Sequence, residues 1–225
     1  MPTLGVGRSQ EVMVILEKAI REKKIPEIPV YVQGMVWDVT AIHTAYPDFL
    51  NGRMRRMIFH ENKNPFLSEI FRKVGSSKEM EEIIHSEKPC VIMATSGMMV
   101  GGPSVEYFRN LAENPKHSLI FTCYQGEGSL GRRIESGEKE ISFPTGPNTS
   151  EVVRVRMEVH SIRGFTGHST RNQLLNFVYR LNPKPKRIIV NHGESSKCLD
   201  LASTLHKIHK VETNAPRNLD ALRLK

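Results

Sequence analysis

The stretch that decides the fold is Ile162–His192, which reads IRGFTGHSTRNQLLNFVYRLNPKPKRIIVNH. It predicts two strand ends joined by an amphipathic helix. The first strand ends near Phe165, and the second is the apolar run Arg187–Asn191. One histidine follows each strand, His168 after the first and His192 after the second. Because the carboxyl ends of strands in an open α/β sheet lie at one edge, we expect the two imidazoles to face one cleft.

The helix between the two histidines has clear start and stop signals. Ser169 or Thr170 is expected to cap its first turn, and Asn182-Pro183 to end it. Its predicted buried stripe consists of Leu174, Leu175, Val178 and Leu181. A histidine at a strand end is more often a hydrogen-bonded structural residue than a functional one. The spacing alone therefore does not assign a role to either histidine.

Composition indicates a globular protein of one domain, or of one domain with an appendage. The chain has 225 residues, 39% of them hydrophobic, and a formal net charge of +8. This basic excess favours a polyanionic partner, although proteins that bind none also show it. No apolar run is long enough to span a bilayer, and the first residues do not form a signal peptide, so we expect a cytoplasmic protein without membrane partners. Its three cysteines are far apart, which indicates neither disulfides nor a cysteine zinc site.

Apolar strand patterns alternate with helical patterns along the chain, which predicts a parallel sheet flanked by helices. A longer segment, Val152–Val159, alternates apolar with polar residues and predicts one strand with a single wet face. Buried strands are expected at 28–32, 89–94 and 119–124, and helices at 12–20, 36–46, 76–84 and 194–208.

Glycine-rich turns supply the candidate phosphate contacts. Thr95–Ser104 is a strand-to-helix turn with Pro103 in the helix's first turn, and backbone N–H groups at such a helix start can hold phosphate. A flexible connector explains this turn equally well. The candidate RNA- or phosphate-binding residues are Arg8, Ser96, Gly97 and Ser104. Arg53, Arg55 and Arg56 could also meet phosphate, but a solvated basic face is the favoured interpretation.

Gly126–Gly131 matches G-x-G-x-x-G, with Glu151 twenty residues further on, as in a dinucleotide-binding fingerprint. Gly137 follows too soon for a crossover helix, and the next predicted strand has a wet face. A nucleotide-dependent oxidoreductase is therefore the least favoured hypothesis, and a thermal-shift measurement that finds no effect of NAD or NADP would exclude it.

Five motifs in order resemble the β-CASP ribonucleases of the metallo-β-lactamase superfamily, and most closely the archaeal cleavage and polyadenylation specificity factor proteins. The likeness covers nearly the whole chain, and its motifs are Gly5–Glu11, Met93–Ser104, Gly126–Gly131, Gly164–Ser169 and Val190–Glu194.

The resemblance implies roles for both histidines. His168 corresponds to the family's motif B histidine, which contacts the scissile phosphate or assists proton transfer. His192 corresponds to the motif C histidine, a zinc ligand. Thr170 departs from the pattern, because relatives commonly carry an acidic residue there. The family further implies RNA as the substrate, homodimers, and two zinc ions that activate water.

The chain lacks the family's main zinc-ligand motif, H-x-H-x-D-H. Because a catalytic zinc needs about three protein ligands, we expect this chain alone not to cleave RNA. The predicted fold is α/β, with a β-CASP domain over residues 1–150 and the C-terminal completion of a metallo-β-lactamase domain over 151–225.

Two functions stay open. The chain is either part of a zinc-dependent RNA-cleaving enzyme, whose missing metallo-β-lactamase segment lies upstream or on another chain, or a non-catalytic RNA-binding or scaffold module. An in-frame H-x-H-x-D-H sequence upstream of the first codon would favour the enzyme.

Overall fold

The computed structural model describes residues 1–162 and 164–224. Arg163, inside the predicted histidine-bearing stretch, and Lys225, the last residue, lie outside the described residues. The chain forms two compact units, Met1–Thr166 (unit 1) and Gly167–Lys225 (unit 2). The two units are defined by how compactly the residues pack, which does not test the domain boundary predicted between residues 150 and 151. That boundary stays a prediction.

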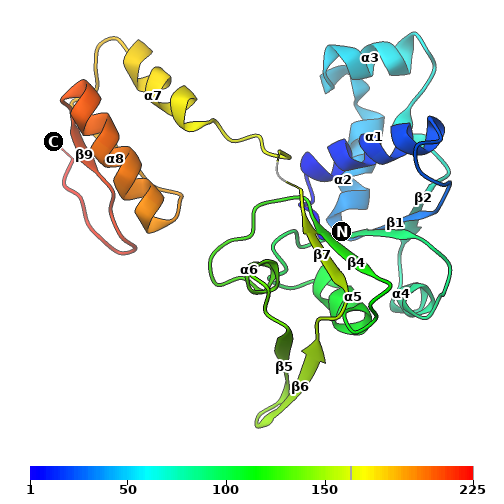
Figure 1. The fold of residues 1–225 in the computed structure, drawn as a ribbon. Coiled ribbons are helices and arrows are strands. Elements are labelled where there is room, and N and C mark those ends of the chain that lie inside the picture. The colour runs from blue at the N-terminus through cyan, green and yellow to red at the C-terminus, as the bar shows by residue number, and fades with distance from the viewer. Residues whose placement is uncertain (163, 225) are drawn as a thin grey trace. The chain divides into compact units, whose positions relative to one another are not determined.

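The first half of unit 1 contains a three-stranded parallel sheet in the order β2-β1-β3, of which Figure 1 labels β1 and β2. The strands are β1 (Val30–Gln33), β2 (Phe71–Val74) and β3 (Val91–Ala94). Val30 and Val32, on the same face of the central strand, are fully buried, whereas Tyr31 and Gln33 on its other face are half-buried. Helix α1 (Arg8–Arg21) precedes β1. Between the strands lie α2 (Met35–Ala45), α3 (Gly52–Phe59) and α4 (Ser77–Ile84), with 3₁₀ turns η1 (Pro47–Phe49) and η2 (Pro65–Leu67).

The second half of unit 1 packs helices α5 and α6 and a hairpin around another parallel pair of strands. Strands β4 (Ser118–Phe121) and β7 (Glu158–Ser161) are parallel, whereas β5 (Glu140–Gly146) and β6 (Thr149–Arg154) form an antiparallel hairpin. Helices α5 (Pro103–Leu111) and α6 (Leu130–Glu135) precede the hairpin. Their shared core includes Phe108, Phe121, Ile134 and Ile141.

The prediction of one strand over Val152–Val159 is wrong. Its first residues belong to β6 and its last to β7, which pair with different partners. Between them, the N–H groups of Arg156 and Met157 both donate to the carbonyl oxygen of Ala112 at the end of α5. This contact turns the chain from the hairpin into the parallel pair, while Val155 and Met157 stay buried. An alternation of apolar and polar residues cannot distinguish one long strand from two successive strands whose apolar residues are both buried.

Unit 2 is a β-α-β arrangement with one additional helix. Strands β8 (Arg187–Ile189) and β9 (Glu212–Asn214) are parallel and are joined by α8 (Ser195–His209), while α7 (Arg171–Arg180) precedes them. Buried side chains from α7 and α8 meet the end of β8: Val178, Val190, Ala202 and Leu205.

The predicted α/β class with a mainly parallel sheet is confirmed. Helix α6 has only six residues and leads into an antiparallel hairpin, so Gly126–Gly131 lacks the β-α-β setting of a dinucleotide site. Glu151, the acidic residue of that pattern, forms an ion pair with Arg109. None of the described helices has the length and apolarity to cross a membrane.

Candidate nucleic-acid and metal site

Three of the glycine-rich motifs follow parallel strands and pack together in unit 1. We call them the motif-loop cluster, which consists of Leu4–Gly7, Thr95–Gly102 and Cys123–Ser129. The second and third loops follow β3 and β4, and the first follows a short segment at the start of the chain, where Pro2 bridges Ala94 in parallel. The cluster therefore lies where open α/β sheets place their ligands.

Gly97 lets two of these loops approach a third. A Cβ atom at Gly97 would lie 2.8 Å from Cys123 Sγ and 2.9 Å from the backbone nitrogen of Leu4. The amide nitrogen of the buried Gln125 donates to Gly97 O at 3.0 Å, and no hydrogen-bond partner for its Oε1 is found among the described residues. Gln125 thus holds two motif loops together. Sequence reasoning missed Gln125, because a single glutamine forms no pattern.

The two candidate phosphate-binding serines use their hydroxyl groups inside the loop. Ser104 is buried, and its Oγ donates to Ser96 O at 2.8 Å. Ser96 Oγ donates to Gly101 O at 3.1 Å and accepts from the N–H of Val100 at 2.9 Å. The N–H of Ser104, at the start of α5, donates to Thr95 O, and Pro103 has no N–H. Phosphate binding at Ser96, Gly97 and Ser104 stays a prediction, and it requires this loop to exchange internal hydrogen bonds for ligand contacts.

Arg8 lies at the start of α1, beside the first loop of the cluster. Its guanidinium forms an ion pair with Glu11 one turn later. The backbone there is fixed by Gln10, whose Oε1 accepts from the N–H of Gly7 at 2.7 Å and whose Nε2 donates to Thr40 Oγ1 at 3.1 Å. Arg8 is thus held on a rigid turn, but its role in phosphate binding stays a prediction.

His168 lies in the bend before α7 and is exposed. The helix that follows it is capped as predicted: Thr170 Oγ1 accepts from the N–H of Gln173, and Gln173 Oε1 accepts from the N–H of Thr170 at 2.7 Å. This reciprocal pair satisfies two N–H groups at the helix start. Thr170 therefore performs the capping role at the position where the resemblance implied an acidic residue.

His192 lies three residues after the end of β8 and is exposed. Its φ angle is +61°, in the left-handed region that side chains other than glycine seldom adopt. Such a conformation is often associated with functional positions, because the surrounding fold must hold it there. The structure thus places both candidate histidines in unit 2, and their meeting at one cleft stays a prediction.

The described residues alone do not fit a catalytic zinc ion. No group of three or more His, Cys, Asp or Glu side chains that could hold a metal occurs within residues 1–162 and 164–224. His192 can therefore supply one ligand at most, whereas a catalytic zinc takes about three from protein. We derive no chemical step through a metal from this chain.

Cys90 and Cys123 are poor candidates for an alternative nucleophile. All three are free thiols, and burial raises the pKa of Cys90 and of Cys123. Because the thiolate is the reactive form, this shift lowers the reactivity of these two thiols at neutral pH.

Helix α3 carries a basic and aromatic face, whose arginines were predicted from the sequence to be solvated. Arg53, Arg55, Arg56 and Phe59 are exposed, whereas Met54 on the opposite side is buried. Within the described part of the chain, none of these arginines forms an ion pair. Phe49, just before the helix, is 89% exposed. We call Phe49, Arg53, Arg55, Arg56 and Phe59 the α3 face.

Two known domain families match successive parts of the chain. Residues 9–134 match the Beta-Casp domain, and residues 152–216 match the Zn-dependent metallo-hydrolase RNA specificity domain. The first match covers more than half of the chain.

Three archaeal proteins are similar to the whole chain. The chain is 52% identical over 225 residues to the transcription termination factor FttA of Thermococcus kodakarensis, 51% identical to that of Methanocaldococcus jannaschii, and 45% identical to that of a Lokiarchaeum species. Each comparison covers 100% of this chain and 35% of the relative. The chain thus spans about a third of the length of these relatives.

Proposed function

Because the chain belongs to the Beta-Casp domain family, we propose that it is the RNA-binding part of an RNA-cleaving, zinc-dependent nuclease that acts in archaeal transcription termination. The observation that supports this most is the order of the two matches on one chain, a Beta-Casp domain followed by an RNA specificity domain. The metal centre is completed by residues outside this chain, with His192 as one ligand. His168 acts on the phosphate or on a proton during cleavage.

The α3 face supports the RNA-binding half of the proposal. Guanidinium groups that are not neutralised by carboxylates attract phosphates, and exposed aromatic rings stack on unpaired bases. Arg53, Arg55 and Arg56 supply the first property, and Phe49 and Phe59 supply the second. The net charge of +8 adds long-range attraction. Single-stranded RNA is therefore the favoured ligand of this face.

RNA binding is tested with the 225-residue chain and a fluorescent single-stranded RNA at several salt concentrations. We expect affinity to fall steeply as salt rises, because bound phosphates release counterions. The variant Arg53→Glu/Arg56→Glu should bind at least tenfold more weakly and with a smaller salt slope. The matched control, Lys78→Glu/Lys139→Glu, changes the net charge equally at exposed positions of unit 1 that lie outside the α3 face. Equal losses in the two variants would contradict a specific role of the α3 face.

A non-catalytic RNA-binding module is the second candidate function. It is favoured by the lack of a group of metal-binding side chains within the described residues. The two candidates differ in one result: a longer protein that contains this chain and binds RNA, but does not cleave it when zinc is supplied, supports the module.

A further inference from the structure

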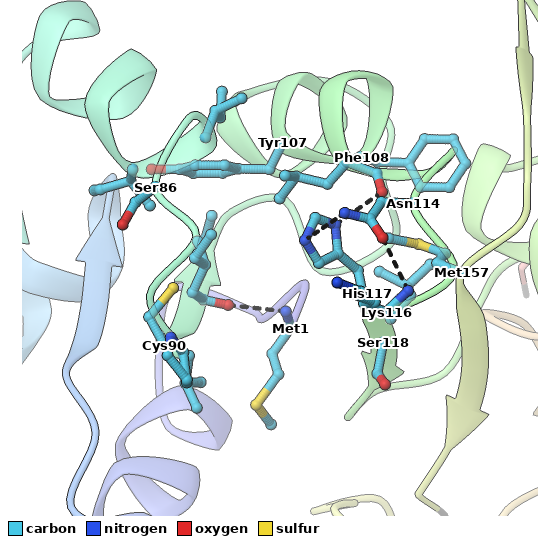
Figure 2. Close-up of a pocket in the computed structure, with 18 of the residues that line it drawn as sticks. Met1, Ser86, Cys90, Tyr107, Phe108, Asn114, Lys116, His117, Ser118 and Met157 are labelled. Atoms are coloured by element: carbon cyan, nitrogen blue, oxygen red, sulfur yellow. Dashed lines mark hydrogen bonds between the residues drawn. The ribbon is translucent and has the colours of Figure 1, made fainter.

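Unit 1 contains a cavity of about 690 Å³ beside the first residues of β3 and β4. Tyr107 and Phe108 of α5 form part of its wall, and Met1 also lines it (Figure 2). Burying phosphate charges against apolar side chains of this kind costs free energy. A path for RNA from the motif-loop cluster therefore has to lie on exposed surface, and helix α2 provides such a surface.

Helix α2 begins in direct contact with the motif-loop cluster. A Cβ atom at Gly34, just before the helix, would lie 2.6 Å from Thr95 Oγ1, and one at Gly5 would lie 2.7 Å from Sδ of Met35. The helix has 11 residues and so extends about 16 Å from this start. At its far end, Tyr46 leads into η1 and then into α3 (Figure 1). Helix α2 thus connects the motif-loop cluster to the α3 face.

The outer side of α2 is apolar although it is exposed. Met35, Ile42 and Tyr46 are 58%, 57% and 59% exposed. Their spacing of seven and four residues places them on one side of the helix, while Val36 and Thr40 face the core and are buried. We call Met35, Ile42 and Tyr46 the α2 stripe. Because a helix that is apolar on all sides is normally buried, we expect a ligand to cover this stripe.

The surroundings of the α2 stripe favour a narrow, negatively charged ligand with apolar faces. The arginines of the α3 face lie at its far end, and they form no ion pair within the described part of the chain. Asp38 is the only Asp, Glu, Lys or Arg residue of α2, and it lies in the first turn, where it offsets the helix dipole. A stable protein interface needs about 800 Å² from each partner, which is wider than one stripe on one helix. Single-stranded RNA matches better, because its bases are apolar on their faces and its phosphates are charged.

We propose that the α2 stripe and the α3 face form one track for single-stranded RNA that leads to the motif-loop cluster. This inference rests on the proposed function, because it assigns a path to the RNA which that function requires. Bases pack on Tyr46, Ile42 and Met35, and Phe49 of the α3 face continues this row. Guanidinium groups of the α3 face hold phosphates at the far end. Duplex RNA does not fit, because its paired bases are stacked on one another.

The track predicts that affinity depends on the length of the RNA. A short RNA occupies the α3 face or the motif loops, whereas a longer RNA also covers the α2 stripe. Single-strand-binding domains cover roughly 4 to 16 nucleotides, so RNAs of about 4 and about 12 nucleotides distinguish the two cases. The bases contribute as well as the phosphates, so a longer RNA that lacks its central bases should bind more weakly.

The test measures the affinity of the 225-residue chain and its variants for these RNAs by fluorescence anisotropy. Ile42→Glu places a carboxylate in the middle of the α2 stripe. The matched control, Ile15→Glu, makes the same change on α1, where Ile15 is 51% exposed. Tyr46→Ala removes the ring at the end of the stripe, whereas Tyr46→Phe keeps the ring and removes only the hydroxyl group.

We expect Ile42→Glu and Tyr46→Ala to weaken binding of the longer RNA at least about fivefold, because each removes a base contact. Ile42→Glu should change the affinity for the short RNA less than about twofold. Ile15→Glu and Tyr46→Phe should bind the longer RNA like the unmodified chain. The RNA without central bases should bind the unmodified chain at least about fivefold more weakly and should be insensitive to Tyr46→Ala.

Equal losses in Ile42→Glu and Ile15→Glu, or an equal loss for both RNA lengths in Ile42→Glu, would overturn the track and leave the α3 face as an RNA site. Absence of RNA binding by the unmodified chain would overturn the track and the proposed function together. A changed oligomeric state of Ile42→Glu in analytical ultracentrifugation, with RNA affinity unchanged, would show that a second copy of the chain covers the stripe, and would overturn the track as well.

Discussion

At the scale of single residues, close packing decides the identity of Gly97. Its missing Cβ would lie under 3.0 Å from both Cys123 Sγ and the backbone of Leu4, and backbone cannot move aside cheaply. Gly97→Ala should therefore lower the free energy of unfolding by about 1–3 kcal/mol. The matched control is Gly52→Ala, where no atom lies within 4 Å of the added Cβ, and it should leave stability unchanged or slightly raised. Urea unfolding of both variants measures the difference, and equal effects would refute the packing argument.

The buried amino group of Met1 gives stability a specific pH dependence. Its pKa is 8.0 when exposed and about 5 in the fold, so the unfolded chain binds more protons between these values. Stability should therefore rise as pH increases from about 5 to 8, by at most about 4 kcal/mol from this group. The same chain with an acetylated Met1 amino group has no such group to titrate. Unfolding curves of both chains across this pH range test the prediction, and parallel curves would contradict it.

At the scale of elements, the cap of α7 accounts for part of the stability of unit 2. Thr170→Ala removes the acceptor of the Gln173 N–H and should cost about 1 kcal/mol. Ser169→Ala, at the neighbouring exposed position, should change stability by less than about 0.5 kcal/mol. Exchange of the Gln173 amide should accelerate only in the Thr170 variant. Acceleration in both variants, or in neither, would mean that the cap lies elsewhere.

Elements with strong local signals could be predicted from sequence, and those set by distant contacts could not. Periodicity and capping residues predicted α1, α4, α7 and α8 near their observed bounds. The hairpin β5–β6 was missed, and the Val152–Val159 prediction failed, because the carbonyl of Ala112 breaks that segment from elsewhere in the chain. The edge strand β2 also escaped prediction: two charged residues, Arg72 and Lys73, occupy its middle.

The same limit applies to the candidate site. The motif order identified the family, and the loops that follow β3 and β4 lie where strand ends predicted them. The internal hydrogen bonds of Ser96 and Ser104 could not be foreseen, because a serine hydroxyl looks identical in sequence whether it faces a ligand or its own loop. The arginines of the α3 face were not favoured as phosphate contacts from sequence. Their exposure, and the absence of ion pairs to them among the described residues, become visible only in the fold.

At the scale of the whole molecule, the 225-residue chain should bind zinc weakly at best. Affinity depends on the number of ligands and on their supporting hydrogen bonds, and His192 is a single ligand. Elemental analysis after dialysis should find well under one zinc per chain. One tightly bound zinc per chain would show that the chain alone completes a metal site.

The central claim is that His192 and His168 serve different steps of RNA cleavage in a longer protein that completes the metal centre. The most direct test compares His192→Ala and His168→Ala in that protein by zinc content, RNA affinity and single-turnover cleavage. His192→Ala should lose zinc and cleavage together. His168→Ala should keep its zinc and most of its RNA affinity while cleavage falls by about two to four orders of magnitude, because a group that meets the phosphate mainly in the transition state contributes to rate. Loss of zinc in His168→Ala, or cleavage at the unmodified rate in His192→Ala, would contradict the account.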